Sequence, residues 1–131
     1  MLLALDASTV VHGCQSATGL TPLQPYRLVA PPLLWSEASS ALHQLSWRGT
    51  ITRELATKAF ERLLAAPIEA QAPADLRREA WRVADDLGWT KTYDAEYVAL
   101  ALLLDCPLLT LDERLRRGAA RAVKVVGPTE L

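Results

Sequence analysis

Two short apolar runs, each followed directly by an aspartate, constrain most strongly what this chain can fold into. Leu2–Leu5 ends at Asp6, and Leu108–Leu111 ends at Asp112. Continuous apolar runs of this length predict strands buried on both faces, as in a parallel sheet. Sites in such sheets form outside the carboxyl ends of the strands. The pattern therefore predicts two acidic side chains in one crevice, with the alternative that each only caps the turn or helix after it.

The chain between these runs alternates between helical and extended patterns. Helices are predicted over 33–48, 53–66, 75–87 and 93–104, with a helical turn over 113–117. Further short strands are predicted over 67–70 and 123–126, and the proline-rich segment 18–32 is expected to be a loop. Thr52, Asp75 and Thr92 are the expected N-terminal caps, and Gly88 is an expected stop.

This alternation predicts the α/β class. We expect a three-layer α/β/α sandwich around a central, mainly parallel sheet of four to five strands, built as one domain over residues 1–131. Half of the residues are hydrophobic and the net charge is −1, which excludes a disordered chain. Two cysteines, Cys14 and Cys106, are too few for a disulfide framework and are expected to be reduced thiols.

The composition also bears on location and partners. The apolar run Tyr97–Leu104 is far shorter than the ~20 residues needed to cross a bilayer. Asp6 interrupts the apolar start of the chain, so neither a signal peptide nor a membrane role is predicted, and a cytoplasmic location is expected. The isoelectric point of 6.1 is not that of a globally basic nucleic-acid binder. A nucleic-acid function must therefore depend on a local basic patch.

Two further acids occupy positions where a carboxylate is costly. Glu37 lies at the edge of the apolar arc of its predicted helix, where a boundary glutamate with a solvated carboxylate is the alternative interpretation. Asp94 lies in the first turn of a helix that is apolar almost all round, and such a helix is expected to be buried. An unpaired buried carboxylate is unfavourable, so Asp94 needs a partner or a wet crevice.

Convergence of Asp6, Glu37, Asp94 and Asp112 would make the four carboxylates repel one another unless a cation neutralises them. Oxygen-only ligands suit Mg²⁺ or Mn²⁺, which are held by a few carboxylates together with water and substrate phosphates. Such a site hydrolyses phosphodiesters through an activated water. The four acids are therefore the candidate catalytic and metal-binding residues.

Four blocks of sequence carry a family resemblance that spans residues 2 to about 126. They are Leu5-Asp6-Ala7-Ser8, Glu37 with Ala41-Leu42, Thr92 to Ala101, and Pro107 to Leu115. With these blocks the chain resembles PIN domains, and more closely the VapC-type toxin ribonucleases of bacterial toxin–antitoxin pairs.

The resemblance implies a PIN-like α/β/α fold and an endoribonuclease with Mg²⁺, replaceable by Mn²⁺. It implies that Asp6 and Asp94 bind the metal directly, that Glu37 and Asp112 complete the acidic ring, and that Ser8 and Thr110 orient carboxylates or water. It also implies a cognate VapB-like antitoxin, an RNA substrate, a homodimer, and a heterotetramer or larger assembly with the antitoxin.

Arginines follow the fourth acid closely and are candidates for RNA binding. Arg114, Arg116 and Arg117 could line a phosphate-binding groove, because Lys and Arg supply most non-specific nucleic-acid affinity, or could form a solvated helix face. The tryptophans are ambiguous. Trp35 and Trp47 lie off the apolar arc of their helix, which suggests a second interface, and Trp89 is expected to pack rather than to mark a substrate surface.

Other α/β enzymes with acids at strand ends fit less well. A phosphoaspartyl receiver needs an acidic pair after its first strand and a lysine after a late strand. Here Asp6-Ala7-Ser8 follows the first strand, and no lysine directly follows Leu111. A haloacid-dehalogenase-type phosphatase needs Asp-x-Asp, but Ser8 occupies the position of the second aspartate. The remaining alternatives are a catalytically silent PIN module and a PIN nuclease that acts outside a toxin–antitoxin pair.

Overall fold

The computed structural model describes all 131 residues and contains one five-stranded parallel sheet with the strand order β3-β2-β1-β4-β5. The strands are β1 (Leu2–Leu5), β2 (Arg27–Ala30), β3 (Ile68–Ala70), β4 (Leu108–Leu109) and β5 (Val125–Val126). The α-helices are α1 (Ala7–Cys14), α2 (Leu33–Trp47), α3 (Arg53–Ala65), α4 (Leu76–Leu87), α5 (Tyr93–Leu104) and α6 (Glu113–Ala119). The predicted α/β class is confirmed, and the sheet is entirely parallel.

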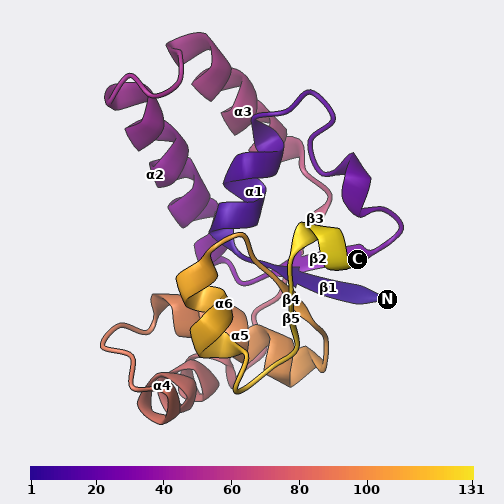
Figure 1. Cartoon of the computed structure of the whole chain (residues 1–131), viewed down its shortest axis with the longest axis vertical. Helices are drawn as coiled ribbons and strands as arrows, with labels where there is room; N and C mark the ends of the chain where they lie inside the picture. The colour runs from indigo at the N-terminus through magenta and orange to yellow at the C-terminus, as the bar shows by residue number, and fades with distance from the viewer.

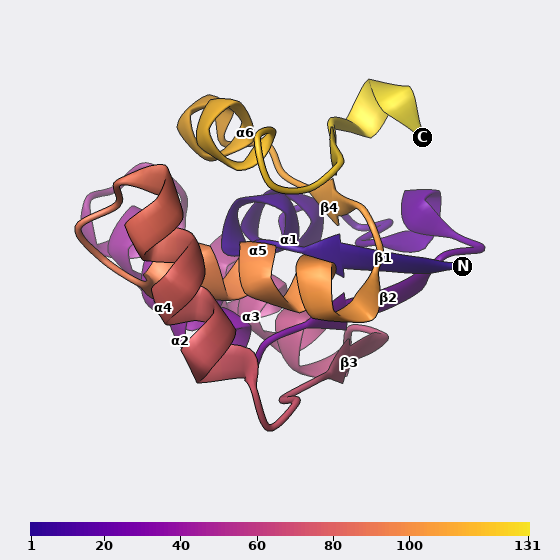
Figure 2. The same ribbon diagram turned by 90° about the horizontal axis from the view of Figure 1, so that it is seen from below.

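The helices form two layers with the sheet between them. Figure 1 shows α1, α2 and α3 above the sheet and α4, α5 and α6 below it. Seen from below in Figure 2, α5 lies in front of β1 and runs roughly along it, with α4 beside it, and α6 lies on the same side of β1 as β4. The contacts agree with this view, because α1, α2 and α3 pack on one another, α4 packs on α5, and α5 packs on β1 and β4. The predicted three-layer sandwich is therefore confirmed.

The path of the chain reverses direction beside β1, the middle strand. It runs from β1 through β2 to β3 on one side, and then crosses back to β4 and β5 on the other. In register, Leu3 pairs with Leu28 of β2, and Leu5 pairs with Leu109 of β4. The connections that leave β1 and β4 go to opposite faces of the sheet, which opens a crevice outside their carboxyl ends. Asp6 and Asp112 follow these two strands.

The hydrophobic core is continuous across both layers. Leu3 and Leu5 of β1, Val29 of β2 and Leu108 of β4 are completely buried in the sheet. Helix α5 is buried at every position from Ala95 to Ala101 except Glu96, which explains why its sequence is apolar almost all round. No helix combines the length and the apolar character that crossing a membrane would require.

Two elements lie where the sequence indicates no regular structure. Helix α1 contains β-branched residues and a glycine, which are poor helix formers, and it is stabilised by its Asp6 cap and by burial of Val10 and Cys14. Strand β2 falls inside segment 18–32, for which the prolines predict a loop, so that prediction is wrong for residues 27–30. The prolines flank the strand, and Leu28 to Ala30 are buried in the sheet, so tertiary packing decides its structure.

The predicted helix boundaries are confirmed to within a residue or two, but not every predicted cap makes a capping bond. The Thr52 hydroxyl accepts from the Leu55 N–H at 3.0 Å, and Gly88 adopts the left-handed conformation that ends α4. Thr92 and Asp75 occupy N-cap positions without a side-chain bond. Their backbones have ψ near 0° instead of the extended value, so the side chains are not directed at the first turn.

Candidate acidic active site

Asp6 lies at the carboxyl end of β1 and is only 3% exposed. Its Oδ1 accepts from the Thr9 N–H at 3.1 Å, so the carboxylate caps α1. The hydroxyls of Ser8 and Thr110 also reach it, at 2.8 Å to Oδ1 and 2.5 Å to Oδ2 respectively. Burial raises the pKa of Asp6, and these hydrogen bonds oppose the increase.

The two hydroxyls are held as donors by backbone groups behind them. The Leu111 N–H donates to Ser8 Oγ at 3.1 Å, and the Asp112 N–H donates to Thr110 Oγ1 at 3.0 Å. Each hydroxyl oxygen thus accepts from the segment that continues β4 and directs its own proton to Asp6. The structure therefore places Ser8 and Thr110 where they orient this carboxylate.

Asp112 follows β4 and begins α6. Its Oδ1 accepts from the N–H groups of Arg114 at 2.9 Å and Leu115 at 3.2 Å. Both strand-end acids are therefore helix caps, as the alternative interpretation proposed. They also lie at the carboxyl edge of neighbouring strands, so capping and membership of a common acidic site occur together.

Glu37 projects from α2 and is half-buried. The Tyr97 hydroxyl donates to Glu37 Oε1 at 2.5 Å, and Tyr97 is 1% exposed within α5. Burial raises the pKa of Glu37, the bond from Tyr97 lowers it, and the charges of Asp94 and Asp6 raise it again. This bond ties the acid of one helical layer to a buried residue of the other.

Asp94 lies in the first turn of α5, at the rim of the same crevice, and its carboxylate accepts no hydrogen bond. Partial burial raises the pKa of Asp94 most, followed by the negative charges of Asp112 and Asp6, and Arg114 opposes these effects. The charges of Asp94 and Asp6 thus act on Glu37, and those of Asp112 and Asp6 act on Asp94, although the four acids come from four separate segments of the chain.

The donor set of this crevice fits a hard divalent cation, because it offers carboxylate and hydroxyl oxygens only. Arg114 opposes the negative charges that raise the pKa of Asp94, and no cation does so for Glu37, so negative charge is in excess among these acids. No three of its side chains converge as a ready-made cage. A Mg²⁺ ion does not need one, since it keeps several waters and takes one or two protein carboxylates.

The three predicted RNA-binding arginines have different surroundings. Arg114 lines a groove of about 540 Å³ beside Glu37 and Asp94. Arg116 forms an ion pair with Glu130 and is engaged away from that groove. Arg117 is exposed on α6 and does not line the groove. Of the three, only Arg114 is thus placed beside the acids.

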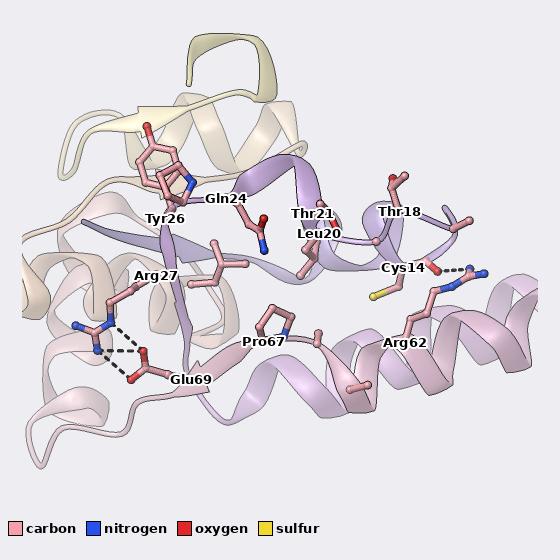
Figure 3. Close-up of a pocket in the computed structure, with 16 residues that line it drawn as sticks. Cys14, Thr18, Leu20, Thr21, Gln24, Tyr26, Arg27, Arg62, Pro67 and Glu69 are labelled. Atoms are coloured by element: carbon pink, nitrogen blue, oxygen red, sulfur yellow. Dashed lines mark hydrogen bonds and ion pairs between the residues drawn. The ribbon is translucent and has the colours of Figure 1, made fainter.

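A larger cavity of about 700 Å³ lies at the amino ends of β2 and β3, away from the acids. Figure 3 shows that its charged groups are already partnered. Arg27 forms a two-nitrogen ion pair with Glu69, and Arg62 donates to the carbonyl oxygen of Cys14 at 2.9 Å. Burial raises the pKa of the Cys14 thiol, which keeps it protonated. This cavity therefore lacks a free reactive group.

Sequence reasoning missed two contributors to the acidic site. Tyr97 resembles any other core residue of α5, and Thr9 lies in a helix that the sequence does not predict. The available signal was spacing: Tyr97 follows Asp94 by three residues, which places both on one side of a helix.

Trp89 packs against the core as expected, whereas Trp47 is 85% exposed.

Comparisons with known proteins identify the family. The model of the PIN domain matches residues 15–121. VapC ribonuclease Mb0985 of Mycobacterium bovis and ribonuclease VapC9 of Mycobacterium tuberculosis are each 33% identical to this chain over 89 residues, which is 68% of this chain and 68% of each relative.

Solved structures show the same fold at lower identity. PAE2754 from Pyrobaculum aerophilum superposes with a TM-score of 0.77 and 21% identity, covering 99% of this chain and 92% of that one. A structure of VapBC2 from Rickettsia felis bound to a DNA fragment from their promoter gives a TM-score of 0.69 and 10% identity, covering 97% and 98%. The family match, the sequence relatives and the shared fold agree that this chain belongs to the PIN domain family.

Proposed function

We propose that this protein is a Mg²⁺-dependent endoribonuclease, with Mn²⁺ able to substitute, and the toxin of a toxin–antitoxin pair. The observation that carries the proposal is the group of four acids, Asp6, Glu37, Asp94 and Asp112. Glu37 and Asp94 line one groove, and the charges of Asp6 and Asp112 raise the pKa of Asp94 beside it. The relatives named as VapC ribonucleases support RNA as the substrate.

In this proposal Asp6 and Asp94 hold the cation, and Glu37 and Asp112 complete the acidic ring. A bound divalent cation would supply an acidified water and positive charge for the phosphate. Ser8 and Thr110 keep Asp6 in a fixed orientation through the bonds they receive from the backbone. Tyr97 holds Glu37 in place from behind, and Arg114 adds a positive charge for the phosphodiester.

The test is cleavage of total bacterial RNA by the purified protein with Mg²⁺, with Mn²⁺ or with EDTA, followed by sequencing of new RNA ends. Asp94→Asn is the matched control, because it removes a charge without removing any hydrogen bond made to Asp94. We expect discrete ends that need the metal and are absent with the variant. Cleavage retained in EDTA or in Asp94→Asn would contradict the proposed site.

The toxin assignment makes a separate prediction. Structures of similar fold contain VapB–VapC or FitA–FitB pairs, which supports a cognate antitoxin for this chain. We expect expression of this chain alone to arrest bacterial growth, and expression of the Asp94→Asn variant to leave growth unaffected. RNA cleavage in vitro without growth arrest would favour a PIN nuclease outside a toxin–antitoxin pair, and neither effect would favour a silent PIN module.

A further inference from the structure

The cavity of about 700 Å³ at the amino ends of β2 and β3 has the size of a small-molecule site, which is typically roughly 300–1,000 Å³. Its walls come from the loop before β2, from the start of β2 and from the carboxyl end of α3. Three of the side chains that line it, those of Cys14, Leu20 and Leu28, belong to the buried core. The cavity therefore offers a small organic molecule an apolar surface that is continuous with the core.

The loop that forms one wall of this cavity is held by its own turns and by α1. The Gly19 N–H donates to the Ser16 carbonyl at 3.0 Å, and the Leu23 N–H donates to the Leu20 carbonyl at 2.9 Å. Leu20 packs on Gly13 of α1, where a Cβ would come within 2.6 Å of the Leu20 Cδ2 atom. The wall is therefore part of the fold, and a ligand would not have to order it on binding.

The charged groups at the two ends of the cavity differ in how they are balanced. Arg27 pairs with Glu69 through two guanidinium nitrogens, so their charges cancel. Arg62 donates from Nη1 to the Cys14 carbonyl at 2.9 Å and forms no ion pair. Figure 3 shows these two groups at opposite ends of the cavity, with Pro67 between them. Because a carbonyl carries no net charge, one positive charge on the cavity wall remains uncompensated.

The charge of Arg62 acts inside the cavity. It lowers the pKa of the Cys14 thiol, against the larger effect of burial, which raises that pKa. A guanidinium has five N–H donors, and Arg62 makes no hydrogen bond other than the one to Cys14. The donors that remain match the planar geometry of a carboxylate.

We propose that this cavity binds a small amphipathic carboxylic acid, with its carboxylate on Arg62 and its apolar or aromatic body against Leu20, Leu28 and Pro67. The carboxylate neutralises the uncompensated charge, and the body covers the apolar part of the wall. The site is separate from the acidic crevice at the carboxyl ends of the strands. The proposal does not depend on the ribonuclease function.

The test is an NMR titration of the isotope-labelled protein with 4-phenylbutyrate, and with 4-phenylbutan-1-ol, which has the same skeleton but no charge. We expect saturable shifts of the amide signals of residues 17–21 and 65–67, which line the cavity, and none in the acidic crevice. For a probe of this size the dissociation constant should be on the order of 1 mM. The alcohol should bind at least about fivefold more weakly, because it cannot form a charge-assisted hydrogen bond.

Variants of the cavity wall separate charge from shape. Arg62→Gln should weaken binding of phenylbutyrate at least about fivefold and leave that of the alcohol unchanged, and Arg62→Lys, which keeps the charge, should lose less. Ala65→Trp places a large side chain at an exposed position that lines the cavity, and it should weaken binding of both probes. The matched control is Arg53→Gln, which removes an exposed arginine of the same helix that lies outside this cavity and forms no ion pair. This control should bind both probes as the wild type does.

Several results would overturn the proposal. They are the absence of saturable shifts at about 10 mM phenylbutyrate, equal affinity for the acid and the alcohol, wild-type binding by Ala65→Trp, and an equal loss of affinity in Arg53→Gln. Shifts centred on the acidic crevice would also contradict it, because they would place the carboxylate elsewhere. None of these measurements involves RNA or a metal ion, so failure here leaves the ribonuclease proposal unaffected.

Discussion

The bond between Tyr97 and Glu37 allows a quantitative prediction. Tyr97→Phe removes one hydroxyl from a residue that is 1% exposed and leaves Glu37 without its donor. Hydrogen bonds to charged groups contribute about 1.5–3 kcal/mol. Glu37 is half-buried, so water regains part of this energy, and we expect the free energy of unfolding to fall by about 1–2 kcal/mol.

This decrease converts to a shift in melting temperature. An unfolding entropy of roughly 2.1 cal/mol/K per residue gives about 0.28 kcal/mol/K for 131 residues. The predicted decrease in Tm is therefore about 4–7 °C at neutral pH in EDTA, measured by thermal denaturation. Tyr26→Phe is the matched control, because the Tyr26 hydroxyl makes no hydrogen bond to the acidic site. The Tm of this variant should differ from that of the wild type by less than about 1 °C.

The pH dependence distinguishes this bond from simple packing. The bond from Tyr97 lowers the pKa of Glu37, so it stabilises the ionised form of that carboxyl. In Tyr97→Phe the pKa of Glu37 should rise, and the difference in Tm from wild type should be largest above the pKa of Glu37 and should shrink as pH falls through it. A difference in Tm that stays the same from about pH 8 to about pH 4 would refute this reasoning.

Three further substitutions test other parts of the structure. Asp94→Asn relieves repulsion without losing a hydrogen bond. The pKa of Asp94 is raised in the folded protein, so its charge lowers stability above that pKa and has no effect below about pH 3.8. We therefore expect the variant to raise Tm in EDTA by about 1–2 °C at about pH 8 but not near pH 3.5. Gly118→Ala should lower the free energy of unfolding by about 1–3 kcal/mol in urea denaturation, because the new methyl group meets Trp89, and a stabilised variant would contradict this packing. Leu100→Ala in the core of α5 should cost about 2–5 kcal/mol, whereas Leu103→Ala, 37% exposed on the same helix, should cost less than half as much; equal losses would contradict the assigned burial.

Much of the fold could be predicted because its strongest elements carry local signals. The strand at the start of the chain and α5 are marked by continuous apolar residues, and α2, α3 and α4 by helical periodicity. Strand β2 and helix α1 carry no such signal. Their sequences are short, proline-flanked or rich in β-branched residues, and their structure depends on burial between β1, β3 and α2, which local sequence does not encode.

The acidic site was predictable for a different reason. A carboxylate beside an apolar run risks costly burial unless it is solvated, paired or hydrogen-bonded. Asp6, Asp94 and Asp112 are therefore conspicuous in the sequence. Tyr97 was not conspicuous, because a tyrosine in a buried helix is ordinary until the position of α2 is known. The packing of Trp89 on Gly118 was equally hidden, since it joins residues from separate segments.

The two roles of each strand-end acid affect how similar sequences should be interpreted. Asp6 starts α1 and Asp112 starts α6, so a descendant that no longer needed the chemistry would still lose stability by replacing either one. Selection for folding alone can therefore preserve both aspartates in an inactive protein. Asp94 caps nothing and accepts no hydrogen bond, and burial together with the charges of Asp112 and Asp6 raises its pKa. Of these three aspartates, Asp94 is therefore the one whose retention in a relative indicates a working enzyme.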